Sequence, residues 1–218
     1  VNIEDLRVNL QEEGALFQTS TDTEIIIHLI AREKGNNLAE KVERALQKIE
    51  GAYSLLLLSP NEIIAARDPH GIRPFCMGKL QDTVVFASET CALDLLGAEY
   101  LRDVQPGEMI VASDDGFYAQ TIRAPQQTKH CIFEYIYFSR PDSKIFGKSV
   151  DKMRREFGRK LAQESPANTG DIVISVPDSS NTCALGFSSE SDIKHEIGLI
   201  RNHYVGRTFI FPSQCLRD

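Results

Sequence analysis

The sequence lacks several features that would place it in a class at once. It has no Cys-x-x-Cys pair, and its cysteines are scattered and odd in number: Cys76, Cys91, Cys131, Cys183 and Cys215. This pattern disfavours a zinc ribbon, a redox dithiol and a disulfide framework. No apolar run approaches the ~20 residues of a transmembrane helix, and no signal peptide is visible. Together these absences predict a reduced, cytoplasmic protein without a membrane span.

The chain also lacks a surplus of positive charge. It carries 24 Lys and Arg residues against 31 Asp and Glu residues, which gives a formal net charge of −7. Proteins that bind nucleic acid usually show a basic surplus, so nucleic acid is not an expected partner. Nucleotides and phosphosugars stay possible ligands, because they need only a local pocket of backbone amides and a few cations.

What is present is enough apolar sequence for a core, 42% of 218 residues. Helical spacing of apolar residues predicts helices over 3–13, 22–35 and 37–51, the second opened by a Thr21-x-x-Glu24 capping box. Short strand-like segments and one short helix (88–97) follow, with a hairpin between 75 and 86 and another around Asp115-Gly116. Residues 1–123 therefore read as an α+β layered domain.

A linker-like stretch, RAPQQT at 123–128, separates this part from a different pattern. Strand-like segments at 131–138, 171–178 and 193–200 alternate with helical ones at 149–164 and 184–191. Such alternation predicts the start of a doubly wound α/β domain. We expect one domain over 1–125 and a second over 126–218.

Five blocks of the sequence carry a resemblance to a known family. They are TSTDTEIIIHLIAR, ARDPHGIRP, EYIYFSRPDS, SVPDSS and RNHYVGRTFIFPSQCLR, in this order over nearly the whole chain. Together they resemble the glutamine phosphoribosylpyrophosphate (PRPP) amidotransferases. The resemblance implies an N-terminal-nucleophile glutaminase domain of α+β fold, truncated at its start. It also implies the beginning of an α/β phosphoribosyltransferase domain, so we expect the chain to be an internal segment.

The activity implied by the resemblance has two steps. Glutamine is hydrolysed to glutamate and ammonia, and the ammonia displaces pyrophosphate from PRPP to give 5-phosphoribosylamine, the first committed step of purine (IMP) biosynthesis. The family's nucleophile is an N-terminal cysteine and its oxyanion hole includes an Asn-Gly pair. Both would lie upstream of Val1, so no catalytic residue is assigned and the chain alone is expected to be inactive. Inhibitory purine nucleotides and a homo-oligomer are further expectations.

For the glutaminase part, the resemblance assigns Asp22 to the α-ammonium group of bound glutamine, a charge-assisted contact. The alternative is that Asp22 only complements the dipole of the helix that it opens. In the ARDPHGIRP block, Arg67, Asp68, His70 and Arg73 are interpreted as a buried polar network that holds the loop. A role for His70 as an acid or base is the less favoured interpretation.

For the transferase part, the resemblance assigns Ser179 as a Mg2+ ligand, with an ordinary turn as the alternative. It also predicts a flexible loop that closes over PRPP, with phosphate held by arginine. The loop residues are Arg201, Asn202, Tyr204, Gly206 and Arg207. His203 stands where many relatives have a permanent cation, and it is not assigned to phosphate binding, because the charge of a histidine depends on pH. The alternative is a solvated basic turn.

Cys131 matches a ligand of a 4Fe-4S cluster in family members that have one. A cluster needs four thiolates, and the others would lie downstream, so a small core residue is the alternative. Two rival functions are kept for the whole chain. One is another glutaminase-coupled synthase, such as a glucosamine-phosphate synthase, which the SVPDSS and RNHYVGRTFI blocks disfavour. The other is a non-catalytic nucleotide-binding or assembly protein on a glutaminase scaffold.

Overall fold

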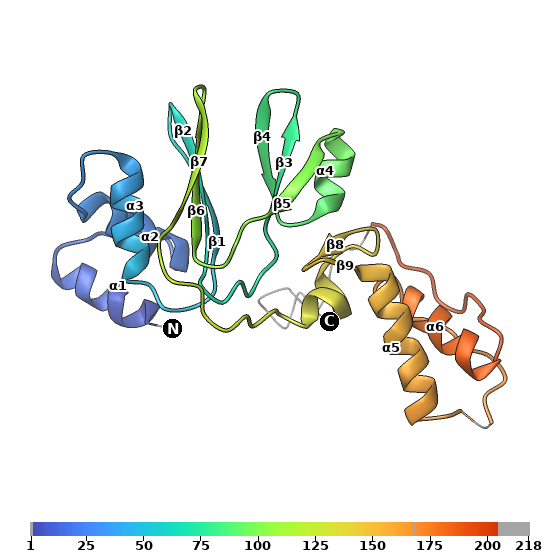
Figure 1. The fold of residues 1–218 in the computed structure, drawn as a ribbon. Coiled ribbons are helices and arrows are strands. Elements are labelled where there is room, and N and C mark those ends of the chain that lie inside the picture. The colour runs from blue at the N-terminus through green and yellow to red at the C-terminus, as the bar shows by residue number, and fades with distance from the viewer. Residues whose placement is uncertain (1, 168, 205–218) are drawn as a thin grey trace. The chain divides into compact units, whose positions relative to one another are not determined.

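The computed structural model describes residues 2–167 and 169–204. The chain divides into two compact units, the first formed by residues 1–134 and 144–147 and the second by residues 135–143 and 148–218. Figure 1 shows the order of the elements along the chain. Each unit is described by itself below.

The first unit begins with three helices, α1 (Ile3–Glu12), α2 (Asp22–Arg32) and α3 (Leu38–Gln47). α3 is capped as its sequence suggests, because the side chain of Asn37 accepts a hydrogen bond from the backbone N–H of Glu40 at 2.9 Å. All three helices agree with the predicted ones, although α2 and α3 end earlier than predicted.

Two antiparallel sheets follow the helices. The larger has the order β1-β2-β6-β7 and contains β1 (Ser54–Leu58), β2 (Glu62–Arg67), β6 (Glu108–Ser113) and β7 (Gly116–Thr121). The smaller has the order β4-β3-β5 and contains β3 (Cys76–Leu80), β4 (Thr83–Ala87) and β5 (Glu99–Asp103). A short helix, α4 (Thr90–Leu96), ends at Gly97, whose φ of 70° suits glycine at a helix C-terminus.

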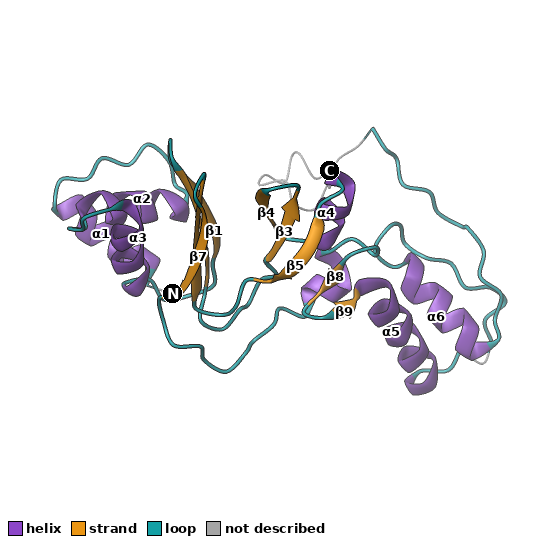
Figure 2. Cartoon of the chain, turned by 45° about the horizontal axis from the view of Figure 1, so that its top comes forward, coloured by secondary structure: helices purple, strands orange, loops and turns teal. Residues whose placement is uncertain are grey.

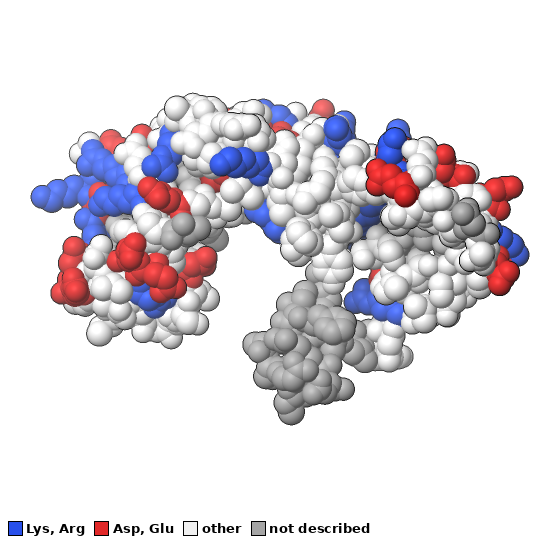
Figure 3. All heavy atoms as spheres, turned by 90° about the horizontal axis from the view of Figure 1, so that it is seen from below, with Lys and Arg blue, Asp and Glu red and all other residues white. Residues whose placement is uncertain are grey.

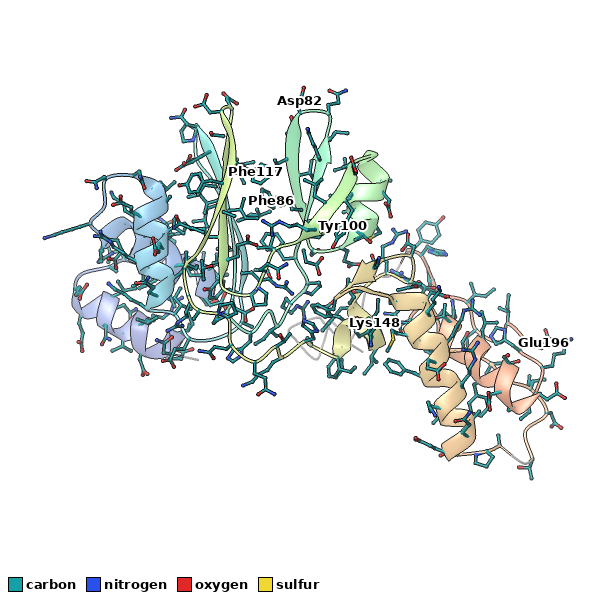
Figure 4. All side chains as sticks on the ribbon, in the orientation of Figure 1. Asp82, Phe86, Tyr100, Phe117, Lys148 and Glu196 are labelled. Carbon is teal, nitrogen blue, oxygen red and sulfur yellow. The ribbon has the colours of Figure 1, made fainter. Side chains whose placement is uncertain are left out.

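These elements form layers, with the helices α1–α3 on one face of the larger sheet and α4 on the smaller sheet (Figure 2). Alternation along the strands builds the cores between layers. On β2, Ile64 and Ala66 pack with the helices, whereas Ala65 belongs to a cluster with Met77 of β3. Phe86 of β4 packs against that second cluster, 6.1 Å from the ring of Phe75 (Figure 4). The predicted α+β layered architecture is confirmed.

Two details of the first unit escaped prediction. Strand β5 was not predicted, because Glu99–Asp103 carries no clean alternation and pairs with β3 through an irregular register at Met77 and Gly78. The predicted Thr21 capping box is wrong in part, since the Thr21 side chain makes no cap hydrogen bond. Both predicted hairpins are confirmed, as β3 pairs with β4 and β6 pairs with β7 across Gly116.

The second unit contains a π-helix, η1 (Glu134–Phe138, its first residue in the first unit), and two long helices, α5 (Val150–Glu164) and α6 (Asn181–Ser191). Two-residue strands, β8 (Lys144–Ile145, which belongs to the first unit) and β9 (Lys148–Ser149), come between η1 and α5 along the chain. The predicted strand over 131–138 is therefore wrong. The buried guanidinium of Arg154 explains the difference, since it donates to the carbonyls of Tyr135 at 2.5 Å and Ser139 at 2.7 Å and so holds a coiled backbone.

The predicted strands over 171–178 and 193–200 reduce to one parallel bridge between Val173 and His195. Parallel strands are normally buried on both faces, but here most of the apolar side chains of both segments are exposed: Ile172, Ile174, Val176, Ile197, Leu199 and Ile200. In the described part of the second unit, no further strand joins this bridge.

Helices α5 and α6 pack through two glycines. A Cβ on Gly158 of α5 would lie 1.9 Å from the carbonyl oxygen of Cys183, and a Cβ on Gly186 of α6 would lie 2.0 Å from that of Arg155. The two backbones thus approach more closely than any side chain allows. Both helices were predicted, but this crossing has no signal in the sequence beyond the glycines themselves.

Among the described residues, no helix has the length and apolar character needed to cross a membrane. Figure 3 shows one face of the molecule, on which acidic and basic side chains lie close together.

Candidate functional site

Asp22 is the first residue of α2, where its carboxylate is exposed to solvent. Its one hydrogen bond in the described structure is weak, from the hydroxyl of Thr23 to Oδ1 at 3.4 Å. No cationic side chain of the described residues forms an ion pair with it. The carboxylate is therefore free to accept hydrogen bonds from an ammonium group, and its place in the first turn also fits the alternative role of complementing the helix dipole.

Glu24, two residues further on, turns back toward the segment before the helix. Its carboxylate accepts hydrogen bonds from the backbone N–H groups of Gln18 and Thr19, both at 2.8 Å, and from the Thr19 hydroxyl at 2.6 Å. These bonds, the one from Gln18 first, lower the pKa of Glu24 from 4.5 to about 2. Instead of closing a capping box with Thr21, Glu24 thus ties down the chain that leads to Asp22.

Of the four residues in the ARDPHGIRP block that were predicted to form a buried polar network, Arg67 and Asp68 are buried and do so. The guanidinium of Arg67, 3% exposed, donates to the carbonyls of Val104 at 2.6 Å, Gly71 at 3.0 Å and Arg73 at 3.0 Å. The fully buried carboxylate of Asp68 accepts from the backbone N–H groups of His70 and Ile72. Burial lowers the pKa of Arg67, while the nearby carboxylates of Asp103 and Asp68 oppose that shift.

The other two members of this block lie at its edge. Nδ1 of His70 contacts the carbonyl of Gln127 at 2.9 Å, and Arg73 forms an ion pair with the buried Glu134 at 2.9 Å. Because these contacts tie the side chains of the block to neighbouring backbone groups and to the carboxylate of Glu134, they support the structural interpretation of the block rather than catalysis by His70.

A cavity of about 260 Å3 opens beside this network, lined by Glu50, Gly51, Pro69, His70, Arg123 and Gln126. Nearby, the hydroxyl of Tyr53 is buried without a hydrogen-bond partner in the described structure. Burial, with a smaller contribution from Asp68, raises the pKa of Tyr53 to about 12. Arg123 is already engaged, since it donates to the carbonyls of Ile49 and Gln47 at the end of α3. The wall of this cavity is therefore mainly structural.

Cys131 has a free, half-buried thiol, and its backbone N–H donates to the carbonyl of Ile72 at 2.9 Å. Cys76 and Cys183 are also free thiols. Over the described residues, no three metal-ligating side chains of His, Cys, Asp or Glu come together. The described part of the chain therefore does not supply the four thiolates of an iron–sulfur cluster, and Cys131 could contribute one of them only.

In the second unit, Ser179 lies half-buried in the turn after residue 176. Its neighbour Asp178 forms an ion pair with Arg201, with Nη1 and Oδ2 3.0 Å apart. The SVPDSS turn and the start of the predicted loop are thus brought together, although they are 23 positions apart. An oxygen ligand such as Ser179 fits Mg2+, which takes few protein ligands and keeps waters and substrate phosphates around it.

The remaining loop residues are only partly described. Asn202 and Tyr204 are exposed, and the side chain of Asn202 accepts from the backbone N–H of Tyr204 at 2.9 Å. Gly206 and Arg207 lie outside the described residues. Asp22 belongs to the first unit, whereas Ser179, Arg201, Asn202 and Tyr204 belong to the second.

Comparison with known proteins extends over both units. A family model described as a glutamine amidotransferase domain matches residues 1–95. Amidophosphoribosyltransferase 2, chloroplastic, from Arabidopsis thaliana is 49% identical over 100% of this chain and 39% of its own length. The amidophosphoribosyltransferase of Bacillus subtilis is 46% identical, again over 100% of this chain and 46% of its own length.

Solved structures agree with the sequence relatives. The glutamine PRPP amidotransferase from B. subtilis, complexed with ADP and GMP, superposes with a TM-score of 0.90 at 46% identity, over 99% of this chain and 47% of that one. A structure described as the allosteric regulatory enzyme of purine biosynthesis gives a TM-score of 0.89. Over its whole length the chain is thus similar to amidophosphoribosyltransferases. It spans less than half of the length of the family members that it matches.

The five blocks identified in the sequence differ in where they lie. TSTDTEIIIHLIAR covers α2 with its core residues, EYIYFSRPDS begins with η1, and ARDPHGIRP and SVPDSS lie mainly on loops, whereas most of RNHYVGRTFIFPSQCLR is outside the described residues. Sequence reasoning missed Arg7 and Thr19, which contact the same segment as Glu24. It also missed Arg154, the buried arginine of the second unit. Nothing in the sequence marks Arg7 as a functional residue, since it is one polar residue of an amphipathic helix. Arg154 could have been noticed, because it lies on the apolar side of a helix otherwise rich in charge.

Proposed function

We propose that the complete protein to which this chain belongs makes 5-phosphoribosylamine from PRPP and glutamine, releasing pyrophosphate and glutamate. This is the first committed step of purine biosynthesis. The observation that carries the proposal is the match at 46% identity and a TM-score of 0.90 over 99% of the chain, which includes both units. A glutaminase scaffold joined to a different synthase would be expected to match over the first unit only.

In this proposal the first unit binds glutamine. Asp22 holds the α-ammonium group through charge-assisted hydrogen bonds, for which its carboxylate is free. The network of Arg67 and Asp68 keeps the adjoining loop in place. The nucleophile and the oxyanion hole are assigned to parts of the protein outside this chain, so the chain alone is expected to release no ammonia from glutamine.

The second unit contributes to PRPP binding. Ser179 would hold Mg2+, which when bound offsets the negative charge of the pyrophosphate group that leaves. Arg201 lies at the same turn through its ion pair with Asp178, and a phosphate could take the place of that carboxylate. Asn202, Tyr204, Gly206 and Arg207 complete the loop that excludes water from the reacting atoms.

Other ligands follow from the same proposal. Purine nucleotides are proposed as inhibitors, supported by the B. subtilis relative that is described as complexed with ADP and GMP. An iron–sulfur cluster on Cys131 is proposed with three thiolates from outside the described residues. A homo-oligomer and a location in the cytoplasm are also proposed, the latter supported by the free thiols. The Arabidopsis relative is named as chloroplastic, so location differs between relatives.

The test is to express the complete protein and incubate it with glutamine, PRPP and Mg2+. We expect glutamate and pyrophosphate to appear in equal amounts, and Asp22→Asn to raise the KM for glutamine. The Cys131→Ser variant should lose iron, measured by metal analysis and by visible absorption. Absence of pyrophosphate release from the intact, metal-loaded protein would favour the non-catalytic scaffold.

A further inference from the structure

The segment that leads into α2, residues 17–21, lies on the surface and is exposed except for the half-buried Phe17. Exposed connections of this kind are usually among the most mobile parts of a domain. Its last residue, Thr21, is followed directly by Asp22. Any movement of this segment would therefore displace the carboxylate assigned to glutamine.

Two charged side chains hold the segment from opposite sides. Glu24 of α2 accepts from both backbone N–H groups of Gln18 and Thr19 and from the Thr19 hydroxyl. Arg7 of α1 donates from Nη1 to the carbonyl of Thr19 at 3.2 Å and from Nη2 to the carbonyl of Thr21 at 3.0 Å. The donors of the segment thus face an anion, and its acceptors face a cation.

Contacts of the Phe17 ring add to these bonds. The centroid of this ring lies 4.3 Å from the Arg7 guanidinium carbon and 4.5 Å from the centroid of the tilted His28 ring on α2. Phe17 thus connects α1, the segment and α2, and its cation–π contact favours the same placement of Arg7 that the hydrogen bonds require. The Thr19 hydroxyl also lies 2.7 Å from the Thr21 hydroxyl, so the segment is tied internally as well.

We propose that Glu24, Arg7 and Thr19 are positioning residues that hold Asp22 in place for the ammonium group of glutamine. This inference rests on the function proposed above. Glu24 has no freedom to bind glutamine itself, because both its carboxylate oxygens are engaged by Gln18 and Thr19. Asp22 is the nearby carboxylate that is left open, and its position depends on a backbone held by charge-assisted bonds on both sides.

The expected consequence is a defect in glutamine use that leaves the rest of the enzyme intact. Small displacements of a binding group can cost a large part of its effect. We expect Arg7→Ala, Glu24→Gln and Thr19→Val in the complete protein each to raise the KM for glutamine by about tenfold. The three side chains contact one segment, so their effects on glutamine binding should be coupled. kcat at saturating glutamine should change little. Arg7→Lys, which can reach only one of the two carbonyls, should be intermediate.

Ammonium salts provide the internal control, because free ammonia bypasses the glutamine site. The three variants should keep wild-type velocity with PRPP and ammonium, which a misfolded protein would not. Arg159→Ala serves as the matched control, since it removes an exposed arginine and its ion pair with Glu156 in the second unit. It should alter neither the KM for glutamine nor the ammonium-dependent rate.

A double-mutant cycle separates positioning from general structure. If Arg7 acts through Asp22, then Arg7→Ala should raise the KM for glutamine little further when Asp22 is already Asn. Full additivity of the two changes, or an unchanged KM in Arg7→Ala and Glu24→Gln, would overturn the inference while leaving the proposed function standing. A wild-type protein that uses ammonium and PRPP but never glutamine would instead contradict the proposed function.

Discussion

The two units bury their apolar residues to very different extents. In the first unit, three clusters of buried side chains fill the spaces between helices, sheets and α4. In the second, the main contact is between α5 and α6, and apolar residues such as Val176, Ile197 and Ile200 are 68%, 79% and 82% exposed. The first unit therefore has the core of an independent domain, whereas the second relies on one helix crossing and the buried Arg154.

The largest expected effect tests the polar interior of the first unit. Arg67→Ala removes the donors for three carbonyl oxygens, those of Val104, Gly71 and Arg73. Because buried acceptors without partners are costly, we expect a loss of about 4 kcal/mol of unfolding free energy. Hydrogen exchange followed by mass spectrometry should show faster exchange in peptides of the first unit. Lys79→Ala, at the exposed end of β3 with an ion pair to Asp82 at 3.9 Å, should change stability by less than about 0.5 kcal/mol.

A somewhat smaller loss of stability is expected from a substitution in the second unit. Gly158→Ala places a Cβ 1.9 Å from the carbonyl oxygen of Cys183, so α5 and α6 must move apart. Overpacking of this kind costs about 1–3 kcal/mol. Exchange should accelerate over 150–191 and stay unchanged in the first unit. Gly170→Ala is the matched control, since its Cβ would meet its nearest atom at 3.5 Å, an ordinary contact. Equal effects of the two variants would contradict the tight crossing.

The smallest expected effect is a difference in stability that depends on pH and arises from Glu24 in the first unit. Hydrogen bonds hold the pKa of Glu24 at about 2, below its usual 4.5. A lowered carboxyl pKa in the folded state contributes stability that is present above pH 4.5 and is lost as the pH falls toward 2. Glu24→Gln should therefore be less stable than wild type at pH 6, with a difference that shrinks between these two values. Urea unfolding at a series of pH values, followed by a probe in the first unit, measures this. A constant difference down to pH 2 would contradict it.

Local signals were sufficient for much of the fold. Asp115-Gly116 placed the β6–β7 hairpin, Gly97 ended α4, and Ser149 capped α5 by accepting from the N–H of Lys152. Each depends on residues within a few positions of one another, so a single sequence contains the information. The strand predicted over 131–138 is wrong because a residue far along the sequence affects the conformation there. Its aromatic and β-branched residues favour a strand, but a guanidinium from α5 decides the conformation.

The residues of the candidate site also divide into those that the sequence could indicate and those that depend on contacts between distant parts of the chain. Asp22, Ser179 and Arg201 were assigned by resemblance to a family, and the structure adds the ion pair of Arg201 with Asp178. The contacts of Arg7 with Thr19 and Thr21 could not be predicted, because they depend on how α1 packs beside α2. Spacing along the chain carries no information about such contacts.

The segment 123–128 looks like an unstructured connector by composition, yet its backbone continues as part of the first unit. Gln126, Lys129 and Cys131 donate their N–H groups to the carbonyls of Pro69, His70 and Ile72, one after another along the ARDPHGIRP loop. A protease must draw several residues into an extended conformation before it can cut. Trypsin should therefore cleave slowly after Lys129, although that side chain is exposed, and faster once Arg67→Ala loosens the loop to which it is bound.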